Sequence, residues 1–137
     1  MNQASVVEQA FMTCFGHAAA HLVRAPGRVN LIGEHTDYNG GFVLPCAIDL
    51  GTWVAASPRN DNEVRVVALD MGREVVMFPV ASTIAYDTQH PWSNYVRGVV
   101  QIFAERGWLH TGANLVISGN IPQGTGLSSS ASLEVAV

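Results

Sequence analysis

Lysine is absent from the 137-residue sequence, and all seven cationic side chains are arginine. Charged residues make up 13% of the chain, and the formal net charge is −4 at pH 7. A nucleic-acid-binding surface needs a stripe of basic side chains that displaces the counterions of the phosphate backbone. Because this composition offers no such stripe, we expect no nucleic-acid partner and place the scattered arginines in a small-ligand site instead.

The sequence is also poor in cysteine and in long hydrophobic runs. Cys14 and Cys46 lie far apart and outside any Cys-x-x-Cys spacing, which predicts two reduced thiols and no metal or redox motif. No apolar run approaches the ~20 residues that span a bilayer. The first residues also lack the basic and apolar parts of a signal peptide. We therefore expect a soluble, cytoplasmic protein without a membrane partner.

Apolar residues are abundant, at 48% of the chain with a mean hydropathy of +0.20. This composition suffices for the core of one domain. Combined with so few charges, it predicts an unusually apolar surface.

Hydrophobic periodicity predicts alternating helices and strands. The pattern Ser5–Glu8 is typical of a capping box and opens a helix that Gly16 would end. A second helix would open at Pro91 and end at Gly107. A third would follow the glycine- and serine-rich stretch near the end of the sequence. β-type runs lie at 21–31, where Pro26 and Gly27 interrupt the pattern, and at 42–57, 64–69, 74–78 and 113–118, with a turn at 71–73.

Side-chain spacing in the second helix predicts which of its faces is buried. A core stripe is expected at Trp92, Tyr95, Val96, Val99, Ile102 and Phe103, and a wet face at Arg97, Gln101 and Glu105. The histidines outside the motifs below show no pairing in the sequence. We expect surface or packing roles for His17, His21, His90 and His110.

The stretch 119–132 reads Gly-Asn-Ile-Pro-Gln-Gly-Thr-Gly-Leu-Ser-Ser-Ser-Ala-Ser and lies between a predicted strand and a predicted helix. Glycines permit positive φ, and the free amides at a helix N-terminus bind anions. A Walker A loop is excluded because Thr125, not lysine, follows Gly124, and the dinucleotide fingerprint misses by one residue. A flexible linker or a plain helix cap stays an alternative. We predict a phosphate-binding loop made by Gly124, Thr125, Gly126, Leu127, Ser128, Ser129 and Ser130, with a serine hydroxyl as an oxygen donor for Mg²⁺.

A second polar cluster follows a β-type run. Glu34, His35, Thr36 and Asp37 crowd hydrogen-bonding groups into four consecutive positions. Carboxylates accept charge-assisted hydrogen bonds from the vicinal hydroxyls of a sugar. Half of a metal site at His35 and Asp37, or a surface turn stabilised by Asp and Asn side chains, are the alternatives. Arg28 is a further candidate because it follows a strand break.

Together the two segments resemble the first two signature motifs of the GHMP kinases. Residues 26–41, Pro-Gly-Arg-Val-Asn-Leu-Ile-Gly-Glu-His-Thr-Asp-Tyr-Asn-Gly-Gly, are similar to the galactokinase branch of that family. Mevalonate-type relatives usually carry lysine where Arg28 stands. Residues 121–131, Ile-Pro-Gln-Gly-Thr-Gly-Leu-Ser-Ser-Ser-Ala, resemble the second motif, and the similarity extends to 92–100.

The resemblance implies an α+β fold, a mixed β-sheet with helices packed on one face. Residues 1–137 would be a partial, truncated N-terminal domain, with a sugar-binding motif at 26–41, an ATP phosphate loop at 121–132 and the C-terminal domain absent. It also implies transfer of the γ-phosphoryl group of ATP to the anomeric hydroxyl of galactose. By the same resemblance Glu34, His35, Thr36 and Asp37 would contact the sugar, Arg28 would stabilise developing charge, 124–130 would hold ATP, and Ser130 would bind Mg²⁺.

In relatives the aspartate base, a second magnesium ligand and a third glycine-rich motif follow the position of Val137. We therefore expect this chain alone to be inactive. The resemblance also implies a monomeric parent enzyme. A kinase for another sugar, such as N-acetylgalactosamine, and a galactose sensor on a kinase scaffold are the alternatives.

Overall fold

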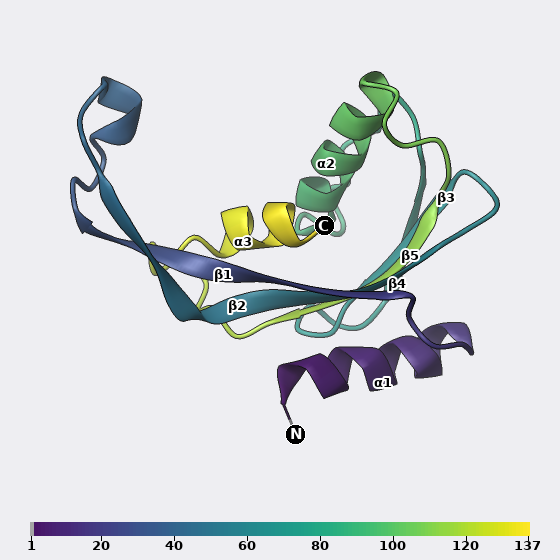
Figure 1. Cartoon of the computed structure of the whole chain (residues 1–137). Helices are drawn as coiled ribbons and strands as arrows, with labels where there is room; N and C mark the ends of the chain where they lie inside the picture. Colours follow the sequence, from purple (N-terminus) through teal and green to yellow (C-terminus); the bar gives the residue numbers. More distant parts are fainter. Residues whose placement is uncertain (1) are drawn as a thin grey trace.

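The computed structural model describes residues 2–137 and contains one five-stranded sheet and three α-helices (Figure 1). None of the helices in this range is long and apolar enough to cross a bilayer. The elements in chain order are α1 (Gln3–Phe15), β1 (His21–Ile32), the 3₁₀ turn η1 (Asp37–Asn39), β2 (Leu44–Pro58), β3 (Glu63–Ala68), β4 (Val75–Pro79), α2 (Ser93–Glu105), β5 (Ala113–Gly119) and α3 (Ser129–Ala136).

The first helix begins earlier than its capping-box pattern predicts. The side chain of Asn2 accepts a hydrogen bond from the Ser5 backbone N–H at 2.9 Å, so Asn2 is the N-cap and the helix starts at Gln3. The predicted stop is confirmed, because Gly16 adopts a left-handed conformation with φ of 77°. The helix buries Val7 completely.

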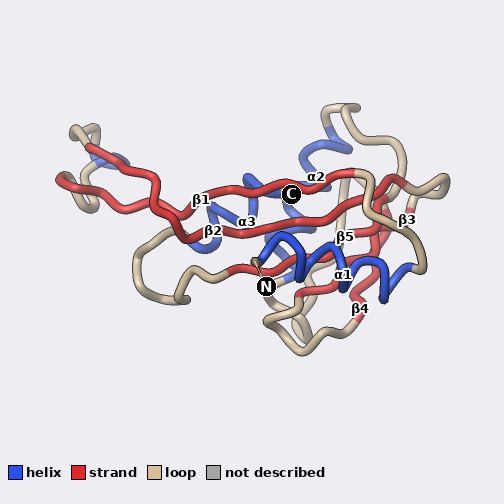
Figure 2. The backbone as a smooth tube through the Cα atoms, turned by 60° about the horizontal axis from the view of Figure 1, so that its bottom comes forward, coloured by secondary structure: helices blue, strands red, loops and turns tan. Residues whose placement is uncertain are grey.

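The sheet has the strand order β1-β2-β5-β3-β4 and is mixed (Figure 2). β3 and β5 run parallel, whereas the other neighbouring pairs are antiparallel. β1 passes through Pro26 and Gly27 without the predicted interruption, and only its register shifts between Pro26 and Arg28. An edge strand tolerates this proline because its unpaired side needs no backbone donor.

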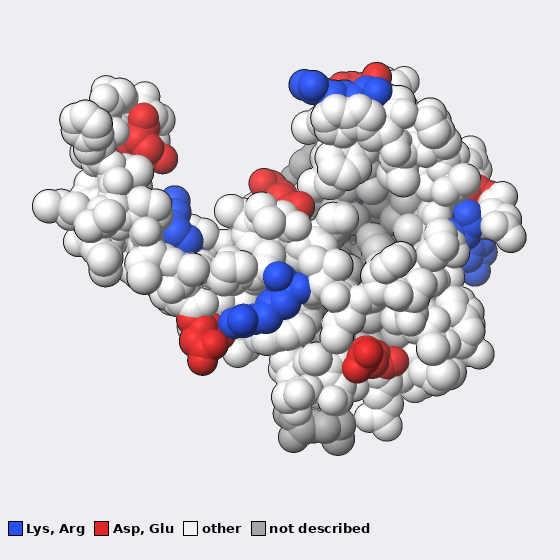
Figure 3. All heavy atoms as spheres, viewed as in Figure 1, with Lys and Arg blue, Asp and Glu red and all other residues white. Residues whose placement is uncertain are grey.

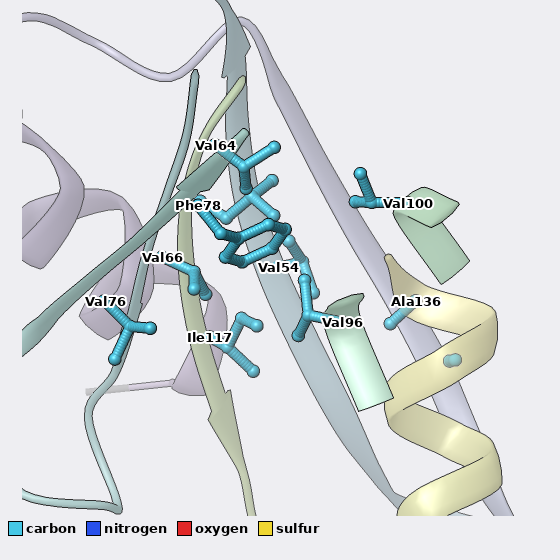
Figure 4. Packing of buried hydrophobic residues seen from close by; sticks show 11 residues of the cluster. Val54, Val64, Val66, Val76, Phe78, Val96, Val100, Ile117 and Ala136 are labelled. Carbon is cyan, nitrogen blue, oxygen red and sulfur yellow. The ribbon is translucent and has the colours of Figure 1, made fainter. Parts of the chain in front are cut away.

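Both faces of the sheet are buried. Val54 and Val66 pack with α2 and α3 (Figure 4), whereas their neighbours Ala55 and Val67 pack with α1. Since successive strand residues point to opposite faces, the helices must lie on both sides of the sheet. The α+β mixed sheet is thus confirmed. The helices were expected on one face of the sheet, and this holds only for α2 and α3. The first helix, α1, lies on the opposite face, where it buries the apolar strand residues of that side (Figures 1 and 2).

The second helix buries only part of the predicted core stripe. Val96 is buried as predicted, together with Ser93 and Val100. Tyr95, Ile102 and Phe103 are exposed, with Ile102 at 52%. Arg97, expected on the wet face, is half-buried and donates to a carboxylate of the preceding segment at 3.0 Å. The helix starts at Ser93 rather than at the proline two positions earlier.

The long β1–β2 hairpin extends away from the rest of the molecule at the end that carries η1 (Figure 1). This end bears large apolar side chains in solvent, in line with the apolar surface that the composition predicts. They are Leu31, Ile32, Tyr38, Phe42 and Leu44.

Candidate active site

The glycine-rich stretch forms a loop of left-handed residues between β5 and α3. Gly124, Gly126 and Ser128 have φ of 71°, 75° and 63°. Side chains disfavour this conformation, so the two glycines relieve strain that Ser128 alone retains. The Thr125 hydroxyl donates to the carbonyl of Pro122 at 2.8 Å and so fixes the turn.

α3 begins directly after this loop, and its first amides have no partner within the helix. Their partial positive charge makes the N-terminus of α3 a suitable anion site. Ser132 fixes the helix to the sheet, since its buried hydroxyl lies 2.8 Å from the carbonyl oxygen of Ala25 and 2.9 Å from Oγ1 of Thr52. The start of α3 is therefore fixed relative to the sheet, with its free amides next to the glycine-rich loop.

β1 and the glycine-rich loop are in direct contact. The Arg28 backbone N–H donates to the Leu127 carbonyl at 3.1 Å, and Nη1 of Arg28 donates to Oγ of Ser128. Gly27 permits this approach, because a β-carbon there would lie 2.8 Å from the Leu127 carbonyl oxygen. The structure thus joins the two segments that the sequence singled out, and their junction is at Arg28.

A cavity of about 820 Å³ adjoins the loop on the side of α2. Ser129 and Ser130 line one wall, and Tyr86, Trp92 and Tyr95 contribute aromatic side chains to its lining. This aromatic lining was not predicted from the sequence, because the helical spacing of Trp92 and Tyr95 indicated a place in the core stripe of α2. The clustering of aromatic residues around the start of that helix was the available signal. The lining also includes Thr52, Ala68, Asp70, Met71, Pro91, Asn94, Ile117, Gly119, Ile121, Gln123, Gly124 and Leu133.

At the far end of the hairpin, two side chains stabilise the backbone of the predicted sugar segment. The Thr36 hydroxyl lies 2.7 Å from the Gly33 carbonyl oxygen and 3.0 Å from that of Phe42. Asn39 donates its amide to the His35 carbonyl at 3.1 Å. In this structure Thr36 therefore acts on the loop itself, and the loop is preorganised.

Two carboxylates of this loop stay accessible. Glu34 and Asp37 are exposed, and neither forms an ion pair with any residue from 2 to 137. His35 has φ of 60°, and its Nδ1 lies 2.8 Å from the hydroxyl of Tyr38. The carboxylate oxygens are thus available to accept hydrogen bonds from a ligand.

The hairpin end curves toward the same side of the sheet as α3, and the N-terminal end of α3 points toward it (Figure 1). A notch separates the two in the space-filling view, with acidic atoms on the hairpin end (Figure 3). Arg28 lies on the strand between the hairpin end and the loop. The structure therefore brings Arg28 to Ser128 directly, whereas residues 34–37 belong to the hairpin end on the other side of this notch. Over the described residues 2–137, no three His, Cys, Asp or Glu side chains come together as a metal site would require.

His90 is paired, so the expectation that it is an isolated surface or packing residue is wrong. Its Nε2 lies 2.9 Å from Oε2 of Glu74, and its Nδ1 lies 3.4 Å from Oδ2 of Asp87. These contacts, first with Glu74 and then with Asp87, raise the pKa of His90 above its ordinary value. The pKa of Asp87 is lowered, mainly by the backbone N–H of His90 and also by Arg97. The sequence distance between Glu74 and His90 hid this cluster.

Comparison with known proteins identifies the class of this fold and site. Residues 9–58 match the galactokinase galactose-binding signature, and residues 94–137 match the GHMP kinases N terminal domain. The chain is similar to the galactokinase of Lactococcus lactis, whose structure is complexed with galactose, with a TM-score of 0.85 and 39% identity over 96% of this chain. The mevalonate kinase of Methanococcus jannaschii shares the fold, with a TM-score of 0.71 and 22% identity over 85% of this chain.

The chain therefore belongs to the GHMP kinase family. Within that family it carries the galactokinase signature and resembles the lactococcal galactokinase along nearly its whole length. It spans 34% of the length of the lactococcal enzyme and 37% of that of the mevalonate kinase.

Proposed function

We propose that this chain supplies the phosphate loop and the sugar-binding hairpin of an ATP-dependent galactose kinase. The contact of Arg28 with Leu127 and Ser128 carries this proposal. This contact brings a guanidinium group beside the N-terminus of α3, where the phosphates of ATP would lie. Phosphoryl transfer depends on such positioning and on positive charge near the transferred group.

The nucleotide would lie along the glycine-rich loop. Its phosphates would accept hydrogen bonds from backbone amides of 124–130, and its base would enter the cavity, where Trp92 offers an aromatic face. The Ser130 hydroxyl, which lines this cavity, would bind Mg²⁺ as a hard oxygen donor. When bound, the ion would neutralise charge on the phosphate oxygens.

The sugar would lie in the notch beside the hairpin. Glu34 and Asp37 would accept hydrogen bonds from its hydroxyl groups, His35 would contribute a ring nitrogen, and Thr36 would keep the loop in shape. The anomeric oxygen would attack the γ-phosphorus, the bond to the β-phosphate oxygen would break, and ADP would leave. Arg28 would stabilise the negative charge that develops on the transferred group.

The proton of the anomeric hydroxyl requires a base, which the family resemblance assigns to an aspartate outside residues 1–137. We therefore expect the chain alone to bind its ligands without turning over galactose. A coupled assay for ADP release with galactose and MgATP tests this expectation, and turnover clearly above the sugar-free blank would contradict it.

Calorimetric titration of the chain with MgATP tests the phosphate site. Arg28→Gln should weaken binding by about tenfold or more, because a charge-assisted contact with the phosphates is lost. Arg28→Lys should recover part of it. Arg106→Gln is the matched control, since Arg106 lies at the far end of α2 and stacks over Trp108. Equal affinity of Arg28→Gln and the wild type would refute the assignment of Arg28.

The hairpin is tested by titration with galactose, with N-acetylgalactosamine as competitor. Asp37→Asn should weaken galactose binding, because the amide that replaces the carboxylate forms no charge-assisted hydrogen bond. In a protein that contains the chain and its missing catalytic groups, galactose binding without phosphoryl transfer would identify a sensor instead of a kinase.

A further inference from the structure

One wall of the cavity is an irregular segment, residues 81–92, between β4 and α2. It contributes Tyr86, Pro91 and Trp92 to the lining. The segment has no regular secondary structure, so side-chain contacts help to fix its position and with it the shape of this wall.

Asp87 is the centre of these contacts. Its Oδ1 accepts hydrogen bonds from the backbone N–H groups of Gln89 and His90, each at 2.9 Å. Its Oδ2 lies 3.0 Å from Nη2 of Arg97 on α2. The Asn94 side chain adds a reciprocal pair, accepting from the Asp87 backbone N–H and donating to its carbonyl, both at 2.8 Å. The segment is therefore fixed to the first turns of α2.

His90 extends this network to the β3–β4 connection. Its two ring nitrogens face two carboxylates, Glu74 from that connection and Asp87 from its own segment. A protonated imidazole can donate to both, whereas a neutral one has a single N–H and presents a lone pair to the other carboxylate. When His90 loses its proton, we expect the contact with Glu74 to be the one that is lost, because the Glu74 side chain is 75% exposed and water can replace the imidazole as its partner.

We propose that Asp87 and His90 are positioning residues for the cavity, and that protonated His90 holds segment 81–92 in the form that completes the aromatic wall. The charged groups that face His90 are Glu74 and Asp87, with Arg97 behind Asp87. This proposal rests on the proposed function at one point, because it takes the cavity to be the nucleotide site.

The sign of the effect follows from the contacts. The pKa of His90 is raised in the folded chain, so the protonated contact is fully present below the ordinary histidine range and is lost as pH rises through the raised pKa. The segment should accordingly be held more firmly at mildly acidic pH than at alkaline pH.

Amide hydrogen exchange of the chain without ligand tests this directly between pH 5.5 and 8.5. Protection factors of amides 84–90, corrected for intrinsic exchange, should fall roughly two- to fivefold across the titration of His90, the range expected for a partly exposed ion pair. His90→Gln should abolish this pH dependence, and His21→Gln, a change at an exposed histidine at the start of β1, should retain it. A pH-independent wild type, or an unchanged profile in His90→Gln, would overturn the proposal.

Glu74→Gln tests the same contact if His90→Gln does not fold. Glu74 is exposed, so its replacement should leave the fold intact, and it keeps the imidazole in place. The midpoint of the His90 titration, followed by the ring proton resonances, should move to lower pH. An unmoved midpoint would overturn the proposal.

The magnesium complex of adenosine 5′-(β,γ-imido)triphosphate provides the second readout. Its dissociation constant should rise over the same pH interval in the wild type and stay level in His90→Gln. If this analogue binds at no pH, the proposed function fails, while hydrogen exchange still decides the role of His90. If it binds with the same pH dependence in both proteins, the positioning role is refuted and the proposed function stands.

Discussion

Gly27→Ala is the smallest change that tests the contact between β1 and the glycine-rich loop. A β-carbon at Gly27 would lie 2.8 Å from the carbonyl oxygen of Leu127 and 3.1 Å from Cδ1 of both Ile121 and Ile48. The carbonyl belongs to the backbone and cannot rotate away. Gly27 itself is buried and lies outside the positive-φ positions, so the cost of the substitution is steric.

Insertion of one methyl group into a packed interior costs about 1–3 kcal/mol. Displacement of the loop would also stretch the hydrogen bond from the Arg28 N–H to the Leu127 carbonyl, now 3.1 Å, which contributes about 0.5–1.5 kcal/mol. We therefore expect the free energy of unfolding to fall by roughly 1.5–4.5 kcal/mol, the sum of these ranges. The affinity for MgATP should fall as well, because the loop is the proposed phosphate site.

Urea unfolding followed by circular dichroism measures the first effect, and calorimetric titration measures the second. Gly98→Ala is the matched control, since a β-carbon at this helical position would meet no atom within 4 Å. Alanine there should stabilise the protein by about 0.5–1 kcal/mol. If Gly27→Ala unfolds at the same urea concentration as the wild type and binds MgATP equally well, the contact does not constrain the loop.

Three further substitutions test other parts of the structure. Phe11→Ala should lower the free energy of unfolding by about 3–5 kcal/mol in urea, because the ring is fully buried between α1 and the sheet; a loss below 1 kcal/mol would contradict this burial. Ser132→Ala should cost about 1–3 kcal/mol in the same assay, because the hydroxyl of Thr52 loses its buried partner, and no change would show that α3 is held otherwise. The pKa of Asp61 is lowered to about 2, first by its hydrogen bond with Arg59; the stability from this pair is present above the ordinary aspartate pKa and is lost as pH falls through about 2. In acid titrations Asp61→Asn should thus be less stable than the wild type at pH 5, and the difference should vanish below about pH 2. A constant difference would refute the assignment.

The strands and both motifs could be predicted from the sequence, because each depends on local chemistry. Alternating apolar residues define the strands, and the order strand, glycine-rich loop, helix requires the positive φ observed at Gly124 and Gly126. The start of α1 could not be placed in this way, because the capping-box pattern pointed to Ser5–Glu8 and only the geometry shows that Asn2 accepts the hydrogen bond.

The sequence by itself determined the chemistry of the two motifs, since residue types and spacing are local properties. Only the tertiary structure decided how they meet. Strand pairing, and the absence of a β-carbon at Gly27, bring Arg28 into contact with Leu127 and Ser128. Ser128 lies 100 positions further along the chain than Arg28. The aromatic lining of the cavity and the pairing of His90 with Glu74 are likewise products of packing, because sheet and helix contacts between distant residues leave no periodic trace in the sequence.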